Sequence, residues 1–275
     1  MEIATFIRHF EAGLRALSSQ PMPEARRSYE ALCQQFTPPI PKSMRIEAST
    51  LAGVGVTHFV PARRVPGPIV FLHGGSFTLG SSRSHRGISA SLAQRLAREV
   101  ISVDYPLAPE ANVETMTLRC LMVVGAAHPA ALVGDSAGAR LAMDLATRLN
   151  GEWPLGLIYP PVNGLSEETL GPDAPLLSRQ DVLSLGLLYP ALLSPAPTPM
   201  PARAIEVLAV ENDPLTGPLE RDIERWRQQG AAIGYRCAPT MVHGALHAHA
   251  LLPNMQSAWQ DFCQALEQRL LLRHS

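Results

Sequence analysis

A serine between two glycines is the feature of this chain most suited to chemistry. Residues 134–138 read Gly-Asp-Ser-Ala-Gly and directly follow the short apolar run 130–133. In a sharp turn from a strand to a helix, flanking glycines allow a backbone conformation that a Cβ would oppose, and the serine hydroxyl stays exposed. A serine hydroxyl is a weak nucleophile unless a general base lies beside it. Ser136 is therefore predicted to be a nucleophile, provided that a base, a carboxylate and oxyanion donors accompany it.

A second glycine-containing segment is suited to stabilising negative charge. Residues 73–76 read His-Gly-Gly-Ser and directly follow the apolar run 69–72. Backbone N–H groups in such a turn can point at a developing oxyanion, and one such donor is worth about 3 kcal/mol in hydrolases. The alternative is a simple turn at the end of a strand. The oxyanion hole predicted from this turn and from the serine motif consists of Gly74, Gly75, Ser76 and Ala137.

A carboxylate is expected between the serine and the base, because the strand–turn–helix serine motif is followed by acid and then histidine along the chain. Asp213 comes at the end of the apolar run 205–210 and is the best placed candidate. Glu211 is a weaker competitor, and Asp213 could instead only cap the turn at Pro214. The acidic residues in predicted helices or in the irregular segment are poorly placed: Asp144, Asp173, Asp181 and Asp222.

Histidines near the C-terminal end of the chain are the candidates for the base. His243 follows the last predicted strand, 232–236, after a short loop at 237–242, from which it could reach over the sheet edge. His247 is the competing base. The pair His243 and His247 has the spacing of two metal ligands on a helix, but no third ligand accompanies it, so no metal is expected.

Two other polar residues near strand ends fit structural roles. His73 is expected to hold its turn through hydrogen bonds. Asp104 also ends a predicted strand, but it precedes Ser136 and so breaks the expected chain order. We predict that it makes structural hydrogen bonds.

The elements that must position these residues form an alternating pattern. Helical spacing separates the strands from the third strand onward, which favours a largely parallel sheet covered by helices. Ligands bind outside the carboxyl ends of such strands, where the candidate residues fall. Short apolar or alternating runs predict eight strands, at 44–49, 54–60, 69–72, 100–104, 130–133, 155–159, 205–210 and 232–236.

Two segments lie outside this alternation. Apolar residues at three- and four-residue spacing predict two amphipathic helices within residues 3–36. Between 160 and 204 the chain is rich in proline, and Ser178 with Asp181 resembles a capping box before an apolar helix. This insertion is either a lid over the sheet or a packing helix with a rigid connector.

Composition bounds the remaining possibilities. At 275 residues with 46% hydrophobic content, the chain can bury a large single core, and its net charge of −1 disfavours a nucleic-acid partner. No apolar run approaches the roughly 18 residues of a membrane span, and the N-terminus lacks a signal-peptide pattern, so a cytoplasmic location without stable membrane insertion is expected. Scattered cysteines suggest neither a zinc site nor a disulfide framework: Cys33, Cys120, Cys237 and Cys263.

Several of these motifs together, in this order, resemble the hormone-sensitive-lipase-like branch of the α/β-hydrolases, which includes bacterial carboxylesterases and acetyl esterases. The resemblance runs from about residue 68 to the end. It rests on His-Gly-Gly at 73–75, Asp-Tyr-Pro-Leu-Ala-Pro-Glu at 104–110, Gly-Asp-Ser-Ala-Gly at 134–138, Asp-Pro-Leu at 213–215 and His-Gly at 243–244.

The resemblance implies an α/β-hydrolase fold with an eight-stranded, mostly parallel sheet, helices on both faces and a helical cap. By this likeness, residues 1–42 contribute N-terminal helices to the cap, and residues 43–275 form the catalytic domain with a cap insertion at about 161–203. The chain departs from the family pattern at several places: Ser76 replaces a third glycine, Pro106 replaces an arginine, Ala139-Arg140 replaces Gly-Asn, and Ala245 replaces a frequent aromatic residue. These departures leave every predicted catalytic group in place. They change residues that shape the pocket, so the substrate of the family does not carry over to this chain.

The expected activity is hydrolysis of a small-molecule carboxylic ester, with a short acyl chain, by a triad of Ser136, His243 and Asp213 through an acyl-enzyme. No metal or organic cofactor is required for this chemistry. The sequence leaves open an amidase, formamidase or acyltransferase on the same triad, and a non-catalytic binding protein. It also leaves monomer and homodimer open, since C-terminal leucines at 266 and 270–272 could pack internally or against a second copy.

Overall fold

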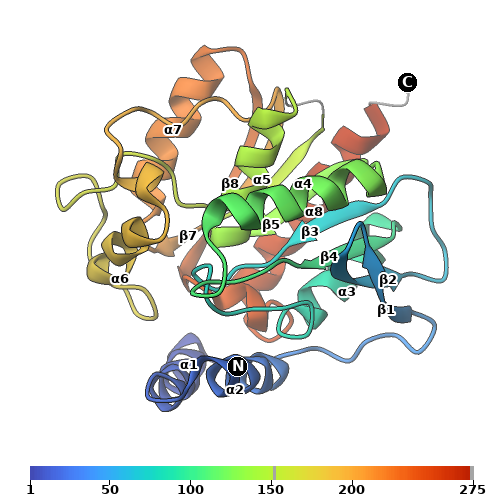
Figure 1. The fold of residues 1–275 in the computed structure, drawn as a ribbon, viewed down its shortest axis with the longest axis horizontal. Helices are drawn as coiled ribbons and strands as arrows, with labels where there is room; N and C mark the ends of the chain where they lie inside the picture. The colour runs from blue at the N-terminus through green and yellow to red at the C-terminus, as the bar shows by residue number, and fades with distance from the viewer. Residues whose placement is uncertain (151–152, 273–275) are drawn as a thin grey trace.

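A single sheet runs through the molecule. The computed structural model describes residues 1–150 and 153–272. Within them the sheet order is β1-β2-β4-β3-β5-β6-β7-β8, with β1–β2 and β2–β4 antiparallel and the other neighbours parallel (Figure 1). The strands are β1 (Arg45–Leu51), β2 (Val54–Val60), β3 (Ile69–Leu72), β4 (Val100–Asp104), β5 (Ala131–Asp135), β6 (Leu155–Ile158), β7 (Ala204–Asn212) and β8 (Ala232–Val242).

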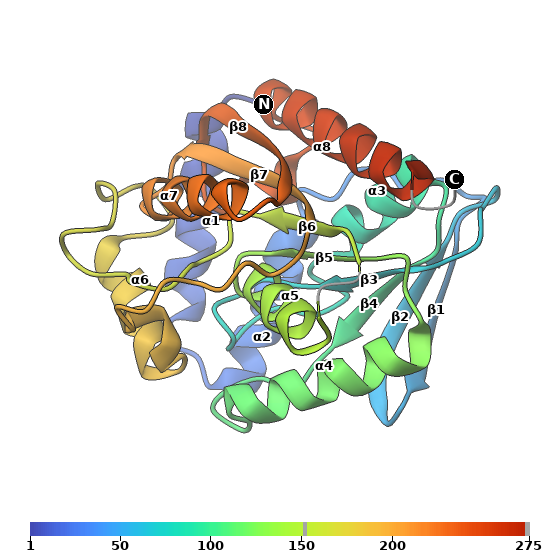
Figure 2. The same cartoon turned by 90° about the horizontal axis from the view of Figure 1, so that it is seen from above.

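Helices cover both faces of this sheet, and the alternation within one strand shows why. In β3, Val70 and Leu72 join the core under α4, α5 and α7, while Ile69 and Phe71 join the core under α3 and α8. A strand buried on both faces reads as a continuous apolar run, as 69–72 does. Figure 2 shows α4 and α8 on opposite sides of the sheet. The helices are α1 (Ile3–Leu17), α2 (Met22–Gln34), α3 (Arg86–Leu96), α4 (Val113–Ala127), α5 (Ala137–Arg148), α6 (Arg179–Ser184), α7 (Thr216–Gln228) and α8 (Pro253–Leu272), with the short 3₁₀ turns η1 (Leu185–Leu187), η2 (Pro190–Leu193) and η3 (Ala245–Ala248).

The predicted fold class is confirmed: the structure is an α/β fold with an eight-stranded, mostly parallel sheet and helices on both faces. The bounds of β2, β3 and β4 are those predicted. All four cysteines are free thiols, and three of them are buried. Among the described helices, none has the length and apolarity needed to cross a membrane.

One predicted loop is instead a strand. Residues 237–242 were expected to form a loop before His243, but they continue β8 and pair with β7 as far as the Asn212–Val242 partners, past an irregularity in register. Pro239 and polar Thr240 made this stretch look irregular. Because β8 lies at the edge of the sheet, a proline is tolerated there without loss of a ladder bond. His243 therefore follows the strand directly.

Helix α2 is bound to the loops at the carboxyl ends of β3 and β4. Arg26 of α2 donates to the carbonyl oxygens of Thr78 (2.9 Å) and Ala108 (2.8 Å) and forms an ion pair with Glu110 (2.6 Å). One guanidinium thus connects α2 to the loop after β3 and to the loop after β4. In Figure 1, α1 and α2 lie below the sheet.

The insertion contains the predicted capping box. The Ser178 hydroxyl accepts from the Asp181 N–H, and the Asp181 carboxylate accepts from the Ser178 N–H, so two unpaired donors at the start of α6 are satisfied together. The predicted apolar helix is shorter than expected, because it passes after six residues into η1 and then η2.

Candidate active site

The turn at the serine adopts the strained geometry that the glycine spacing predicts. Ser136 has φ 50° and ψ −121°, between β5 and α5. A Cβ at Gly134 would lie 2.6 Å from the Gly138 carbonyl carbon, and one at Gly138 would lie 2.5 Å from the His73 carbonyl oxygen. Gly138 is therefore required for the close approach of α5 to the end of β3, and Gly134 for the close approach of the start of α5 to β5. The turn leaves the Ser136 side chain at the start of a helix, facing a cavity.

Three side chains from three strand ends form a hydrogen-bonded chain. His243 Nε2 lies 2.8 Å from Ser136 Oγ, and His243 Nδ1 lies 2.7 Å from Asp213 Oδ2. The other Asp213 oxygen accepts from the Leu215 N–H at 2.9 Å, so the carboxylate is fixed. The pairing of β7 with β8 brings Asp213 and His243 to the same edge, where β5 delivers Ser136. Ser136, Asp213 and His243 thus come together with the geometry of a nucleophile, an orienting acid and a base.

Backbone N–H groups of two turns lie close to Ser136. Gly75 and Ser76 both have positive φ, 118° and 54°. Within the described chain, the N–H groups of Gly75, Ser76 and Ala137 donate to no other group. All three are free to donate to a bound oxyanion.

Gly74 does not fit the expectation that it supplies a fourth donor. Its N–H donates to Asp135 Oδ1 at 2.9 Å, so this donor is already used. A Cβ at Gly74 would lie 2.6 Å from Asp135 Oδ2, and the missing side chain is what allows this approach. Gly74 therefore shapes the turn through its contact with Asp135.

His247 lies too deep to compete with His243 for the serine. It is buried, and its Nε2 lies 3.3 Å from the Tyr29 hydroxyl and 3.7 Å from Cys33 Sγ. Burial lowers the pKa of His247 to about 3, so it is neutral near pH 7. Among the described residues, no group of three His, Cys, Asp or Glu side chains is arranged to hold a metal ion. Glu211, the competing acid, accepts from the Thr240 N–H instead of contacting a histidine.

His73 and Asp104 hold loops, in the positions predicted for them. The His73 ring stacks on Tyr105 with centroids 4.3 Å apart, and its Nδ1 lies 2.9 Å from the Gly74 carbonyl oxygen. Asp104 accepts from the N–H and the hydroxyl of Ser82. The arginine that the family resemblance leads one to expect at position 106 is proline, and contacts of a guanidinium to this segment come from Arg26 of α2 instead.

A small cavity of about 110 Å³ contains the predicted nucleophile and base. It continues into a wider, open groove of about 640 Å³, with which it shares Leu14, Ser76, Leu176 and Leu177. Residues of α1 and α2 and of the insertion therefore line the approach to Ser136. The small cavity is lined by Phe10, Leu14, Tyr29, Gly75, Ser76, Leu79, Asp135, Ser136, Tyr159, Leu176, Leu177, His243, Gly244 and His247.

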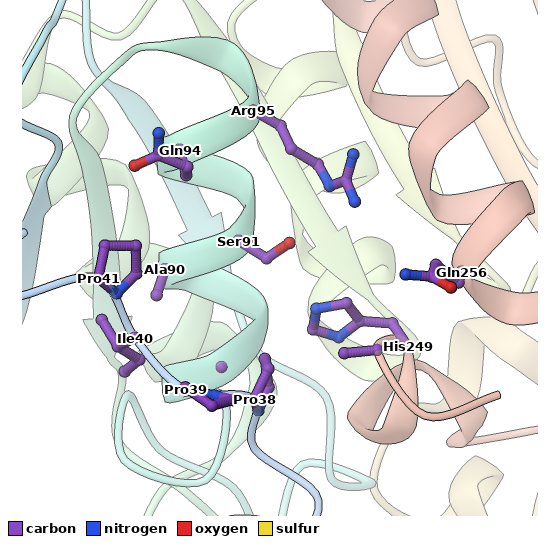
Figure 3. Close-up of a pocket in the computed structure, with 12 residues that line it drawn as sticks. Pro38, Pro39, Ile40, Pro41, Ala90, Ser91, Gln94, Arg95, His249 and Gln256 are labelled. Carbon is purple, nitrogen blue, oxygen red and sulfur yellow. The ribbon is translucent and has the colours of Figure 1, made fainter. Parts of the chain in front are cut away.

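A separate cavity of about 370 Å³ lies elsewhere, between the Pro38–Pro41 segment, α3 and the start of α8 (Figure 3). It is larger than the cavity at Ser136 but contains none of the predicted catalytic residues. His249 lies on its wall, and its Nδ1 is 2.9 Å from the Leu246 carbonyl oxygen. The smaller cavity is therefore the candidate active site.

Buried histidines make the fold sensitive to acid. Burial lowers the pKa of His73 to about 4, of His247 to about 3 and of His249 to about 4. An unfolded histidine has a pKa of about 6.5, so below this pH the unfolded chain takes up protons that the folded chain does not. The stability is therefore present above about pH 6.5 and is lost progressively as the pH falls toward 4, by on the order of 2 kcal/mol per histidine at pH 5.

Replacing one of these histidines should make the free energy of unfolding less dependent on pH. We expect the free energy of unfolding of His249→Gln, measured in urea at pH 7.5 and pH 5, to fall less between the two pH values than that of the wild type. The matched control is His9→Gln, because His9 is exposed. An equal fall in the wild type and in His249→Gln would contradict the assignment of a low pKa to this side chain.

Residues 69–247 match the family described as the alpha/beta hydrolase fold, which is more than half of the chain. The chain belongs to this α/β-hydrolase family. The resemblance of the sequence motifs to the α/β-hydrolases is thereby confirmed.

Individual relatives are named for esterase activity. An esterase of Acinetobacter venetianus is 35% identical over 139 residues, which cover 47% of this chain and 45% of the esterase. The carboxylesterase NlhH of Mycobacterium tuberculosis is 27% identical over an alignment that covers 87% of this chain and 88% of the enzyme. Among solved structures, a hormone-sensitive lipase from a metagenome library superposes with a TM-score of 0.82 at 20% identity, covering 98% and 99% of the two chains, which shows the fold. The match to the Acinetobacter esterase spans less than half of that protein's length.

Proposed function

We propose that this protein hydrolyses carboxylic esters through a triad of Ser136, His243 and Asp213. The observation that carries the proposal is the unbroken chain from Ser136 Oγ through His243, at 2.8 Å and 2.7 Å, to a carboxylate whose second oxygen is held by a backbone N–H. Esterases among the relatives support the same chemistry.

In the proposed mechanism each group has one role. His243 Nε2 takes the proton of Ser136 as Oγ attacks the acyl carbon, and Asp213 holds the imidazole in the tautomer that keeps Nε2 as the acceptor. The N–H groups of Gly75, Ser76 and Ala137 stabilise the oxyanion. The alcohol leaves with a proton from His243, and a water molecule, activated by the same histidine, then releases the acid.

A short arm of the ester fits the small cavity at Ser136. The cavity at Ser136 has a volume of about 110 Å³, and Leu79, Leu176 and Leu177 contribute its apolar walls. The second arm would lie in the open groove. We further propose that residues 1–42 and the insertion at about 161–203 act together as a cap, because Leu14 and Leu177 belong to both cavities.

The test is turnover together with covalent labelling of one serine. We expect the purified protein to hydrolyse p-nitrophenyl esters with activity that declines as the acyl chain grows beyond a few carbons, and a fluorophosphonate to label Ser136 at one equivalent, located by mass spectrometry. Replacing the base with His243→Ala should abolish both, whereas His247→Ala, which changes only a buried side chain of the wall, should retain labelling. Labelling of another residue, or ester turnover that survives His243→Ala, would overturn the proposal.

A further inference from the structure

The larger cavity, between the Pro38–Pro41 segment, α3 and the start of α8, has no part in the proposed mechanism. Its volume is about 370 Å³, and it shares no lining residue with the cavity at Ser136. A cavity of this volume can hold a small organic molecule. Figure 3 shows that its walls differ in character, because the proline segment lies on one side and polar side chains of α3 and α8 converge on the other. The cavity therefore has the form of a second binding site.

Arg95 brings to this cavity a positive charge that no acidic side chain balances. It is half-buried on α3, and its guanidinium points from α3 toward α8 (Figure 3). Within residues 1–150 and 153–272, the Arg95 side chain makes no hydrogen bond or ion pair, and no aspartate or glutamate lines the cavity. A guanidinium presents a planar pair of donors that matches a carboxylate. The charge of the cavity therefore favours an anion.

His249 supplies the opposite kind of group, a fixed hydrogen-bond acceptor. The residue is only 3% exposed, and its Nδ1 lies 2.9 Å from the Leu246 carbonyl oxygen, so Nδ1 carries the proton and donates it. Burial lowers the pKa of His249 to about 4, and the charge of Arg95 adds to this shift, so the ring is neutral near pH 7. Its Nε2 has no partner in the described part of the chain, yet it keeps access to the cavity. Nε2 can therefore accept a hydrogen bond from a ligand.

The other lining residues add a hydroxyl donor and an apolar surface. Ser91 Oγ accepts from Trp259 Nε1 at 2.9 Å, so its own proton is available to a ligand. The apolar surface comes from Ala90 and from the Pro38–Pro41 segment. Because proline fixes φ, this wall loses little conformational freedom when a ligand binds. The cavity thus combines a rigid apolar wall with one cation and one neutral acceptor.

We propose that this cavity is a second binding site, for a small organic monocarboxylate that also carries a hydroxyl group. The carboxylate pairs with Arg95, the hydroxyl donates to His249 Nε2, and the carbon skeleton lies against the Pro38–Pro41 segment. Arg95 is the only charged side chain among the lining residues at neutral pH, which favours a single negative charge on the ligand. An ammonium group in place of the hydroxyl is disfavoured, because no carboxylate of the cavity would balance it. The site does not depend on ester hydrolysis at Ser136.

Titration with matched small molecules tests the proposal. The probes are three hydroxycarboxylates of different shape: 4-hydroxybenzoate, mandelate and 3-hydroxybutanoate. Each is compared with its amide, which lacks the charge, and with the acid that lacks the hydroxyl, namely benzoate, phenylacetate or butanoate. Calorimetry measures Kd, and tryptophan fluorescence gives a second readout, because the Trp259 ring lies 5.9 Å from that of His249. At least one hydroxycarboxylate should bind saturably and about tenfold more tightly than its amide.

Two variants separate the contributions of the two polar groups. Arg95→Gln should raise the Kd of the bound hydroxycarboxylate by about tenfold, as expected for loss of a charged partner. His249→Leu should remove the preference for the hydroxycarboxylate over the acid without the hydroxyl. The matched control is Arg119→Gln, which removes the same charge from an exposed position of α4, on the opposite side of the sheet from α8 (Figure 2). Its Kd should equal that of the wild type.

Several results would overturn the proposal. One is the absence of saturable binding of all three hydroxycarboxylates up to about 10 mM. Another is binding with the same Kd in the wild type and in Arg95→Gln, because the probe then binds elsewhere, for example at Ser136. If Arg95→Gln does not fold, as judged by its melting temperature, the wild type decides: equal affinity for each acid and its amide overturns the proposal. Failure of ester turnover would leave these binding results unchanged.

Discussion

Replacing Ser136 with alanine should lower kcat for ester hydrolysis by about five orders of magnitude or more, because the acyl-enzyme can no longer form. The remaining activity would come from the oxyanion donors and from binding. The side-chain oxygen makes one hydrogen bond, to His243 Nε2, so its loss should change the melting temperature by only a few degrees. Single-turnover kinetics and thermal unfolding measure the two effects separately.

The control for this variant is Ser257→Ala. Ser257 lies exposed on α8, away from the cavity, and its removal should leave kcat and the melting temperature close to the wild-type values. If Ser136→Ala keeps more than a hundredth of the wild-type activity, Ser136 is not the nucleophile. Such a result would remove the basis of the proposed mechanism.

Gly138→Ala should damage both the fold and the activity. A Cβ at this position would clash with the Leu72 carbonyl oxygen and would lie 2.5 Å from that of His73. Both are backbone atoms at the end of β3 and cannot move aside as a flexible side chain would. We expect a loss of about 3 kcal/mol or more in the free energy of unfolding, because overpacking here displaces the start of α5. Since α5 carries the Ala137 N–H and follows Ser136, kcat should fall as well.

A second glycine-to-alanine change isolates the effect of the clash. Gly125 lies in α4, and a Cβ there would meet nothing within 4 Å. In an exposed helix position alanine is favoured over glycine by up to about 1 kcal/mol, so Gly125→Ala should stabilise the protein and leave kcat unchanged. Urea unfolding of the two variants, in parallel, measures the difference. Equal stability of Gly138→Ala and the wild type would show that α5 can shift without cost.

Local patterns predicted the parts of this structure that depend on neighbours in the sequence. Apolar runs gave β3 and β4 their bounds, because a strand buried on both faces is continuous in hydrophobicity. The chain order of serine, acid and histidine predicted three residues that the structure brings within hydrogen-bonding distance. This prediction needed only the positions of the strand ends, because the carboxyl ends of parallel strands lie together on one side of the sheet.

Features that depend on distant contacts could not be predicted in this way. His247 and Tyr29 are 218 positions apart, and neither spacing nor composition indicates that they meet. The extension of β8 was missed because Pro239 looks like a loop residue unless the strand is known to lie at the edge. Gly74 was expected to donate to the oxyanion, but the partner of its N–H, Asp135, is the residue inside the serine motif whose side chain had no predicted role.

The contacts of Arg26 connect the selectivity for substrate with the rate of the reaction. One guanidinium joins α2, which carries Tyr29 into the cavity, to the Thr78 carbonyl oxygen, two residues beyond Ser76. Thr78 in turn donates its N–H to the Gly75 carbonyl oxygen. A shift of α2 that admits a different substrate therefore also pulls on the loop that presents the Gly75 and Ser76 N–H groups. Engineering of selectivity through these N-terminal helices would change KM and kcat together, and variants chosen for a new substrate would need a compensating change in the loop to recover their rate.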